Sequence, residues 1–309
     1  MILTVTPNTA LDHSLIVPEF RANATIRCLE SVVSMAGKAA DVSWMLAKWG
    51  VPSLAMGFAA GANGQRMDAM LREIGVQTDF TWVDGETRLN TVVVTADGCV
   101  HTTFTTATLK VTDDHLADFE ARFQKALPQA TCLVLGGTAA SGAPVTFYRD
   151  LIARGRERGI PTLMDCTGVL QRAGLEAGPT LIKPNLAELE ELTGQKAHDR
   201  QTVYDLARQV QAKYGVSLIV TLGREGAFAL FGEASYWIPP LSVKVVNPAG
   251  AGDAVVAGMT LALARGDRIE DGLRLGFALA AATVQHPATA DYHRQDAEKF
   301  LSQVQVQRL

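Results

Sequence analysis

The sequence predicts an α/β fold in three layers, α/β/α, with a mostly parallel central sheet and a small β lid. From residue 132 onward, short apolar strands alternate with helical patterns, which is typical of a parallel sheet covered by helices on both faces. Two earlier segments, at about residues 12–34 and 86–106, have strand and turn patterns that fit poorly in that sheet, so we assign them to the lid. We expect one domain over residues 1–309.

The elements follow from local patterns. Residues 1–6 form an apolar strand that Pro7 and Asn8 end, which leaves Asp12 just past the strand. An Ala-Asp-Gly turn at residues 96–98 between two β-rich runs predicts a hairpin. Further strands are expected at residues 13–17, 25–29, 51–57, 91–95, 100–104, 132–135, 162–165, 180–183, 217–221, 227–230 and 236–238, and helices at 35–50, 61–75, 144–157, 186–192 and 253–264.

Composition excludes several classes of protein. An apolar fraction of 48%, a charged fraction of 19% and a net charge of −4 are typical of a globular protein and unlike those of a nucleic-acid-binding protein. No apolar run reaches the roughly 18 residues of a membrane span, and the first residues lack a signal-peptide pattern, so we expect a cytoplasmic protein. The cysteines are scattered, which favours reduced thiols over disulfides or zinc; they are Cys28, Cys99, Cys132 and Cys166.

Residues 247–259 carry the clearest chemical signal. Gly250 and Gly252 flank Ala251 and lead into Asp253 at the start of a buried helical run. Glycines let the backbone come close to a ligand, and the free N–H groups of a helix start attract anions. A carboxylate beside such a cradle can take a proton from a hydroxyl while the amides hold the phosphoryl group under attack. The simpler interpretation is a turn followed by an acid that the helix dipole favours.

Other polar residues follow predicted strands. Ligands of open α/β sheets bind beyond the carboxyl ends of the strands, which makes Asp12 and Thr221 candidates. Asn185 and Glu188 are three residues apart at a helix start and share a face. They could hold hydrated Mg²⁺, which prefers oxygen ligands and keeps water. A helix cap with an exposed acid, and a turn acid at Asp12, are the simpler interpretations.

Taken together, these segments resemble the phosphofructokinase B (PfkB) group of the ribokinase-like carbohydrate kinases. Residues 247–258 look like the family's signature around Gly-Ala-Gly-Asp, and residues 183–188 resemble its Asn-x-x-Glu motif. Residues 1–12, 85–90 and 221–226 match in order and rough spacing, so the resemblance covers nearly the whole chain. The opening and the Thr-Arg-x-Asn run look most like the branch that phosphorylates fructose 1-phosphate or tagatose 6-phosphate.

The resemblance implies a ribokinase-like sandwich that transfers the γ-phosphoryl group of Mg-ATP to a hydroxyl of a ketohexose phosphate, with Asp253 as general base. The remaining roles are implied by position. Gly250, Ala251 and Gly252 supply anion-hole amides; Asp12, Gly37, Lys38, Asp41, Arg88 and Asn90 lie toward the sugar; Lys183, Asn185, Glu188, Thr221, Gly223 and Gly226 lie by the nucleotide; Asn185 and Glu188 organise the metal through water.

The departures from the family pattern fall on the sugar side. Ala36 and Asp41 replace the first Gly and the final Asn of the usual Gly-Gly-Lys-Gly-x-Asn. A methyl group at Ala36 crowds a sugar near the backbone, and Asp41 loses a donor and adds a charge that repels phosphate. Thr25 stands where relatives often have Lys, residues 137–140 replace Gly-Ser-Leu-Pro, and a Gly-Pro is lacking near residues 106–107. Arg88 remains, and its guanidinium suits a phosphorylated acceptor.

Two other functions stay open from the sequence. The chain could phosphorylate an unphosphorylated sugar or a nucleoside, although Arg88 and Lys38 argue mildly against this. It could also be a non-catalytic sensor of sugar phosphates, but a sensor needs no base at Asp253. Exposed strand edges and apolar faces of the lid suggest a homodimer through it, which the sequence does not show.

Overall fold

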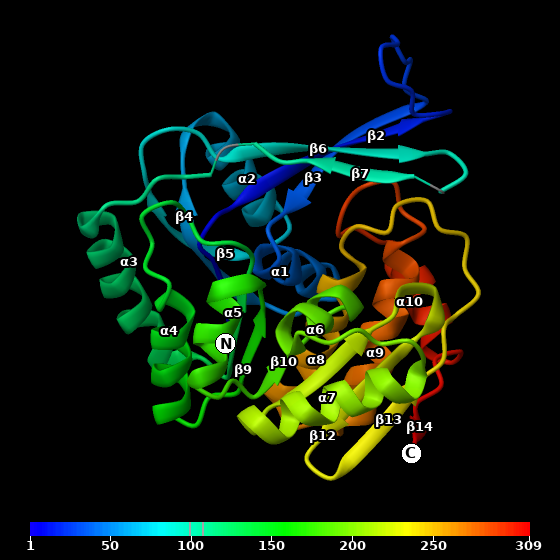
Figure 1. Cartoon of the computed structure of the whole chain (residues 1–309). Coiled ribbons are helices and arrows are strands. Elements are labelled where there is room, and N and C mark those ends of the chain that lie inside the picture. The colour runs from blue at the N-terminus through cyan, green and yellow to red at the C-terminus, as the bar shows by residue number, and fades with distance from the viewer. Residues whose placement is uncertain (99, 107) are drawn as a thin grey trace.

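The computed structural model describes residues 1–98, 100–106 and 108–309, whose strands form a large and a small sheet (Figure 1). The large sheet has the order β14-β13-β12-β11-β10-β9-β8-β1-β4-β5, with parallel pairing from β5 to β11 and antiparallel pairing beyond. Its strands are β1 (Ile2–Thr6), β4 (Ser53–Ala59), β5 (Gln77–Trp82), β8 (Cys132–Gly136), β9 (Thr162–Asp165), β10 (Leu181–Ile182), β11 (Ser217–Thr221), β12 (Ala227–Phe231), β13 (Ala234–Ile238) and β14 (Gln307–Arg308).

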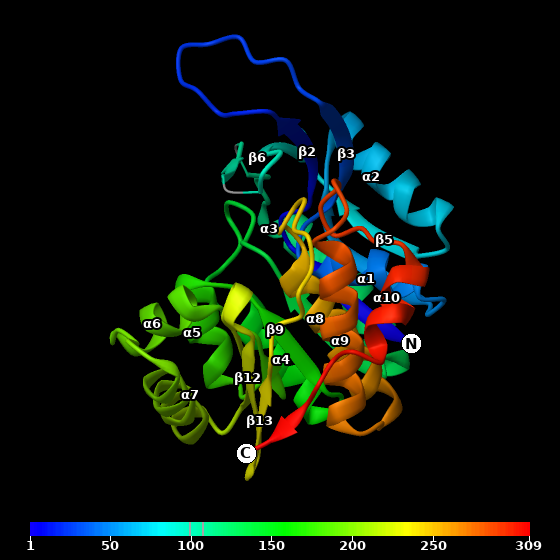
Figure 2. The ribbon, with the colours of Figure 1, turned by 90° about the vertical axis from the view of Figure 1, so that its right-hand side faces the viewer.

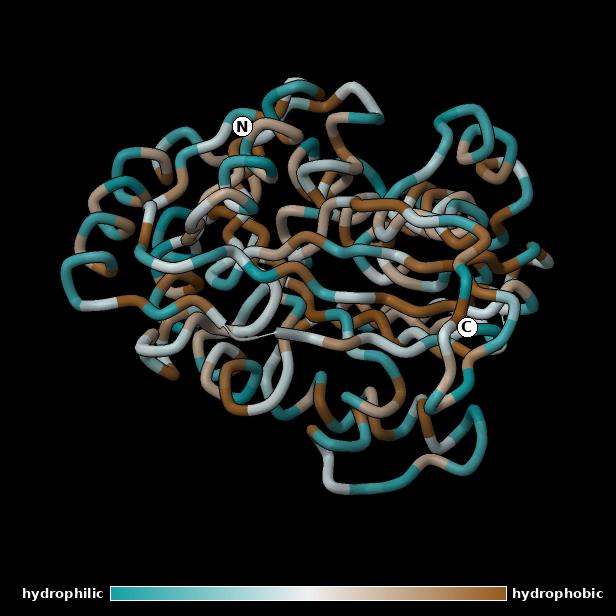
Figure 3. The backbone as a smooth tube through the Cα atoms, turned by 90° about the horizontal axis from the view of Figure 1, so that it is seen from above, coloured by the Kyte–Doolittle hydropathy of each residue, from teal (hydrophilic) through white to brown (hydrophobic). Residues whose placement is uncertain are grey.

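Helices cover both faces of this sheet (Figure 2). One face carries α1 (Ala39–Lys48), α2 (Gly61–Glu73), α8 (Ala251–Arg265), α9 (Ile269–Thr283) and α10 (Arg294–Leu301). The other carries α3 (Asp113–Ala126), α4 (Phe147–Glu157), α5 (Gly168–Glu176), α6 (Leu186–Thr193) and α7 (Arg200–Tyr214). In β1, Leu3 packs with the second group and Ile2 with the first, as the alternation of strand side chains requires. The helices at the rim alternate between hydrophilic and hydrophobic residues (Figure 3).

The small sheet lies over one edge of the sandwich (Figure 1). Its order is β3-β2-β6-β7, from β2 (Ala10–Val17), β3 (Glu30–Ala36), β6 (Arg88–Thr95) and β7 (His101–Phe104). Strand β2 runs parallel to β6 and antiparallel to β3, which places Asp12 beside both Asn90 and Ser34. The two segments assigned to the lid therefore pair with each other, and the lid role of this sheet remains a proposal.

Close helix packing sets the position of α8. A Cβ on Gly258 would lie 2.2 Å from the Gly276 backbone nitrogen, so only glycine lets α8 and α9 approach this closely. The hydrophobic contact between these helices anchors α8 beneath the small sheet, with its first turn at the carboxyl edge of the large sheet (Figure 2). Among the described residues, no helix is long and apolar enough to cross a membrane.

The structure confirms the predicted α/β fold with its mostly parallel sheet. The strand expected at residues 25–29 is wrong: the strand is β3, and the helix expected from residue 35 begins at Ala39. Asp12 is not in a loop after the first strand but is the third residue of β2, because the chain turns within residues 7–9 and enters the small sheet at once. Strand β5 was missed because Gln77, Thr78 and Asp79 make its first half polar.

Candidate active site

The first turn of α8 presents Asp253 at the edge of the sheet. Gly250 caps the helix with φ 85°, a left-handed conformation that glycine adopts without strain. The preceding loop is fixed by Asn247, whose Oδ1 accepts from the Ala249 N–H at 3.0 Å and whose Nδ2 donates to the Pro287 carbonyl at 2.9 Å. The Asp253 side chain is buried, so its carboxyl group is held in a low-dielectric pocket.

The backbone of Ala290 packs closely against this turn. A Cβ on Gly250 would lie 2.4 Å from the Ala290 backbone nitrogen, which leaves no room for any other residue at the helix start. Ala290 itself has φ 54°, a conformation that costs a non-glycine residue of order 1 kcal/mol. The loop around Ala290 therefore belongs to the site, although no local pattern in the sequence indicates it.

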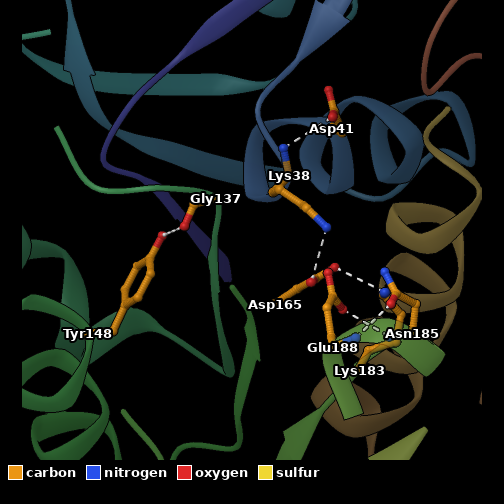
Figure 4. A network of polar contacts seen from close by, with 8 residues as sticks. All are labelled: Lys38, Asp41, Gly137, Tyr148, Asp165, Lys183, Asn185 and Glu188. Atoms are coloured by element: carbon orange, nitrogen blue, oxygen red, sulfur yellow. Dashed lines mark hydrogen bonds and ion pairs between the residues drawn. The ribbon is translucent and has the colours of Figure 1, made fainter. Parts of the chain in front are cut away.

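Two lysines converge on the buried carboxylate of Asp165 (Figure 4). Asp165, at the end of β9, accepts a hydrogen bond from Lys38 Nζ at 3.1 Å and lies 3.3 Å from Lys183 Nζ. A Cβ on Gly252 would lie 2.9 Å from Lys183 Nζ, so the glycine keeps this ammonium group close to the start of α8. Positive charge and helix N–H groups thus meet where an anion would bind.

The charges of this cluster act on one another. Burial raises the pKa of Asp253 to about 6, and the neighbouring Asp165 charge adds to that while Lys38 and Lys183 oppose it. Burial also works against the charged form of Asp165, but the two ammonium groups outweigh it and hold the pKa of Asp165 below its ordinary value. Burial likewise lowers the pKa of Lys38, yet the charges of Asp165, Asp253 and Glu188 leave that pKa raised.

A second polar group lies on the small-sheet side of Asp253. Asn90 Nδ2 donates to Asp12 Oδ1 at 2.8 Å, and the negative charges of Asp12 and Asp253 both act on buried Asp41. Arg88 donates from NH2 to the Asn8 carbonyl at 3.4 Å. Within the described residues, Asn90 Oδ1, Arg88 Nε and Asp41 Oδ1 are buried without a hydrogen-bond partner. Buried polar atoms left unsatisfied are costly, so these atoms are candidates to bind a polar ligand.

A pocket of about 770 Å³ opens beside the first turns of α8. Thr221, Gly223 and Gly226 line it, together with Gly252 at the helix start. Several other walls come from parts of the chain that the sequence did not assign to a site: residues 239–245, the end of α9, and the hairpin tip at residues 96–98. The volume and the mixed apolar and polar lining suit a nucleotide.

Asn185 and Glu188 form a reciprocal helix cap. Asn185 Oδ1 accepts from the Glu188 N–H at 2.9 Å, and Glu188 Oε2 accepts from the Asn185 N–H at 2.8 Å (Figure 4). In the described ranges, no group of three or more His, Cys, Asp or Glu side chains is arranged to hold a metal ion. A divalent ion here would take most of its ligands from water and phosphate, which suits Mg²⁺.

Of the predicted residues, Thr221, Gly223, Gly226 and Gly252 line one pocket, and Lys38, Lys183 and Asp12 act on Asp253. Lys38, which we expected toward the sugar, directs its ammonium group toward Asp165 and away from Asp41 (Figure 4). Gly37 (φ 119°) and Lys38 (φ 55°) both have positive φ, so the backbone bends sharply just before α1. Asp165 was recognised only as a strand end. Of the cysteines, Cys132 and Cys166 are buried and Cys28 is partly exposed, whereas Cys99 lies outside the described residues. Residue 107, one of the two positions near which the family's Gly-Pro is lacking, also lies outside them.

Comparison with known proteins gives a family match to "pfkB family carbohydrate kinase" over residues 5–295. A protein from Thermotoga maritima described as a possible 1-phosphofructokinase is 27% identical, with TM-score 0.88 and coverage of 100% of this chain and 99% of that one. Phosphofructokinase-2 from Escherichia coli, in complex with substrates and products, is 25% identical, with TM-score 0.88 and 98% coverage of each chain. A tetrameric inhibited form of the same enzyme has TM-score 0.84, 25% identity and 98% coverage of each.

Proposed function

We propose that this chain, which belongs to the pfkB family of carbohydrate kinases, transfers the γ-phosphoryl group of ATP to a hydroxyl of a ketohexose phosphate, fructose 1-phosphate or tagatose 6-phosphate. The family match makes the chain a sugar phosphotransferase. The observation that carries the finer proposal is the position of Asp253, in the first turn of α8, where it interacts with two lysines and with the buried acids Asp12 and Asp41. That is the place of a base between donor and acceptor.

In the proposed reaction, Asp253 accepts the proton of the acceptor hydroxyl as that oxygen bonds to the γ-phosphorus. The bond from the γ-phosphorus to its bridging oxygen breaks, and ADP leaves. The N–H groups at the start of α8 and the charges of Lys38 and Lys183 stabilise the phosphoryl group in transit. The pocket of about 770 Å³ would hold the nucleotide, and Mg²⁺ near Asn185 and Glu188 would neutralise phosphate charge.

At acid pH, Asp253 should become protonated and no longer act as the base. Because the pKa of Asp253 is raised to about 6, we expect kcat/KM to fall as the pH drops through about 6 and Asp253 takes up a proton. Lys38→Met should move this acid limb to higher pH, since the Lys38 charge lowers the pKa of Asp253. The pH profile of kcat/KM measures both effects, and exposed Lys299→Met is the matched control. An acid limb that stays in place in Lys38→Met would contradict this electrostatic coupling.

Arg88 supports an acceptor that already carries a phosphate. Its Nε is buried without a partner among the described residues, and guanidinium groups bind phosphate through paired N–H bonds. The family neighbours are phosphofructokinases, which favours the same class of acceptor. The alternative, a neutral sugar or nucleoside, is favoured by Asp12, whose negative charge acts on both Asp41 and Asp253.

Arg88→Ala is expected to raise KM for a phosphorylated acceptor about 10- to 100-fold, the value of one charge-assisted contact, with a smaller change in kcat. Arg88→Lys should recover part of the loss, because it restores the charge without the paired geometry. Steady-state kinetics with the acceptor varied give both constants, and Arg66→Ala, an exposed arginine of α2, is the control. An unchanged KM would indicate a neutral acceptor or another anchor.

A panel of acceptors tests the proposed function directly. ADP release from Mg-ATP would be measured with fructose 1-phosphate, tagatose 6-phosphate, fructose 6-phosphate, free ketohexoses, ribose and nucleosides. Turnover of fructose 1-phosphate or tagatose 6-phosphate alone is the expected result. Turnover of a neutral sugar or nucleoside alone would overturn the proposed acceptor class. An absence of ADP release with every acceptor would favour a sensor.

The small sheet is also the proposed dimer surface. Large apolar side chains are exposed on its strands and loops, including Phe20, Leu29 and Phe104. Burial of these side chains against a second copy would remove apolar area from water. Sedimentation of the wild-type chain beside Phe20→Ser and Phe104→Ser tests this, and a wild-type monomer would contradict it.

A further inference from the structure

Three buried carboxyl groups from three different elements interact electrostatically. Asp12 comes from β2, Asp41 from the first turn of α1, and Asp253 from the first turn of α8. Each is at most 8% exposed. Asp253 and Asp12 act electrostatically on Asp41, and Asp12 acts on Asp253, so the three groups form one cluster.

Asp41 has the least compensated position of the three. Its Oδ2 accepts the Lys38 backbone N–H at 3.1 Å. Its Oδ1 is buried and has no hydrogen-bond partner among the residues that the structure describes. The Lys38 ammonium group, the cation that acts on Asp41, is directed away from it toward Asp165 (Figure 4). The other charges with the largest effects on Asp41 are those of the acids Asp253 and Asp12.

Burial and the neighbouring negative charges favour the protonated form of Asp41. Burial penalises the charged carboxylate, and the charges of Asp253 and Asp12 add to that penalty. Together they raise the pKa of Asp41 well above its ordinary value, against the smaller opposing effects of the Lys38 backbone N–H and charge. A phosphorylated acceptor would bring still more negative charge and strengthen the preference for the neutral acid.

We propose that Asp41 binds the acceptor as a hydrogen-bond donor, through a proton on Oδ1 directed at an oxygen of the sugar or its phosphate. This inference rests on the proposed function, because it takes the acceptor to lie beside Asp253. The Asp41 proton stays in place during the reaction, and the proton of the acceptor hydroxyl goes to Asp253. Asp41 thereby supplies the donor that an asparagine would supply, but only while it is protonated.

The proposal makes acceptor affinity depend on pH. In the wild type, affinity should weaken as the pH rises through the pKa of Asp41, because binding must then take up a proton. Asp41→Asn carries a permanent N–H donor, so its affinity should lack that alkaline loss. Asp41→Ala has no donor and should bind the acceptor about tenfold more weakly at every pH. The acid limb of kcat, which reports Asp253, should persist in Asp41→Asn.

Calorimetric titration with fructose 1-phosphate and tagatose 6-phosphate, in paired buffers of different ionisation enthalpy, measures affinity and proton uptake together. The wild type and Asp267→Asn, an exposed acid after α8, should take up more protons than Asp41→Asn above the Asp41 midpoint. Subtracting the proton uptake of Asp41→Asn from that of the wild type cancels the protons that the acceptor's own phosphate exchanges on binding. Equal uptake in Asp41→Asn and the wild type, or equal affinity of Asp41→Ala and Asp41→Asn, overturns the proposal.

A measurement without acceptor separates this inference from the proposed function. The carboxyl ¹³C resonance of Asp41, assigned by its loss in Asp41→Asn, can be titrated in the free protein. A midpoint near the ordinary aspartate value of about 3.9 overturns the donor role whatever the acceptor is. If the midpoint is raised but neither ketohexose phosphate binds, Asp41 is neutral and the proposed acceptor class is overturned. The proposed donor role of Asp41 toward a phosphorylated sugar is then overturned as well.

Discussion

Asp253→Asn is expected to lower kcat by on the order of 10²-fold or more, while the dissociation constants of ATP and acceptor change little. The amide cannot accept the hydroxyl proton, but it keeps the shape of the carboxyl group. Folding should not suffer, because burial already disfavours the charged form of Asp253 and raises its pKa to about 6. Single-turnover kinetics and separate binding titrations distinguish the loss of chemistry from a loss of affinity.

Asp267→Asn is the matched control for this experiment. It makes the same substitution at an exposed position just beyond the far end of α8, and full activity is expected. A turnover of Asp253→Asn within a few-fold of the wild type would exclude Asp253 as the base. A large loss of acceptor affinity with preserved single-turnover chemistry would instead make Asp253 a binding residue.

Asp165→Asn is expected to have the largest effect on stability, a loss of about 3 kcal/mol in the free energy of unfolding. Asp165 is 3% exposed and pairs with Lys38 and Lys183, so its neutralisation leaves two ammonium groups without their paired carboxylate, one of them deeply buried. Because the same lysines face the start of α8, we also expect weaker ATP binding. Denaturant unfolding at neutral pH measures the stability term.

The pH dependence gives this prediction a second check. The two lysines lower the pKa of Asp165, so its stabilising effect is full above the unfolded-state pKa of about 3.9 and is lost as the pH falls through the lower folded-state pKa. The difference between wild type and Asp165→Asn should therefore narrow at strongly acid pH. Asp296→Asn, which breaks a surface pair with Lys299, should change stability by about 0.5 kcal/mol or less. A similarly small effect of Asp165→Asn would show that the buried pairs do not stabilise the fold.

The sequence determined the features that depend on neighbours a few residues away. The alternation of strands and helices fixed the layered sheet, because each apolar face must be buried against another layer. The glycines before Asp253 placed that residue in the first turn of α8, and Asn185 and Glu188 were recognised as a helix start where the structure has a reciprocal cap. The resemblance to the PfkB family rested on these same local motifs, and the family match confirms it.

The tertiary structure decided whatever depends on distant parts of the chain. The direction of the Lys38 side chain follows from its partner Asp165, 127 residues away, and from the bend at Gly37. The limited room at Gly250 comes from Ala290, and the raised pKa of Asp41 follows from burial and from the acids of two other elements. Burial and electrostatic fields are properties of the assembled fold, because both depend on which groups exclude water from one another. The sequence alone therefore indicated where the site lies, and only the fold showed how its charges are balanced.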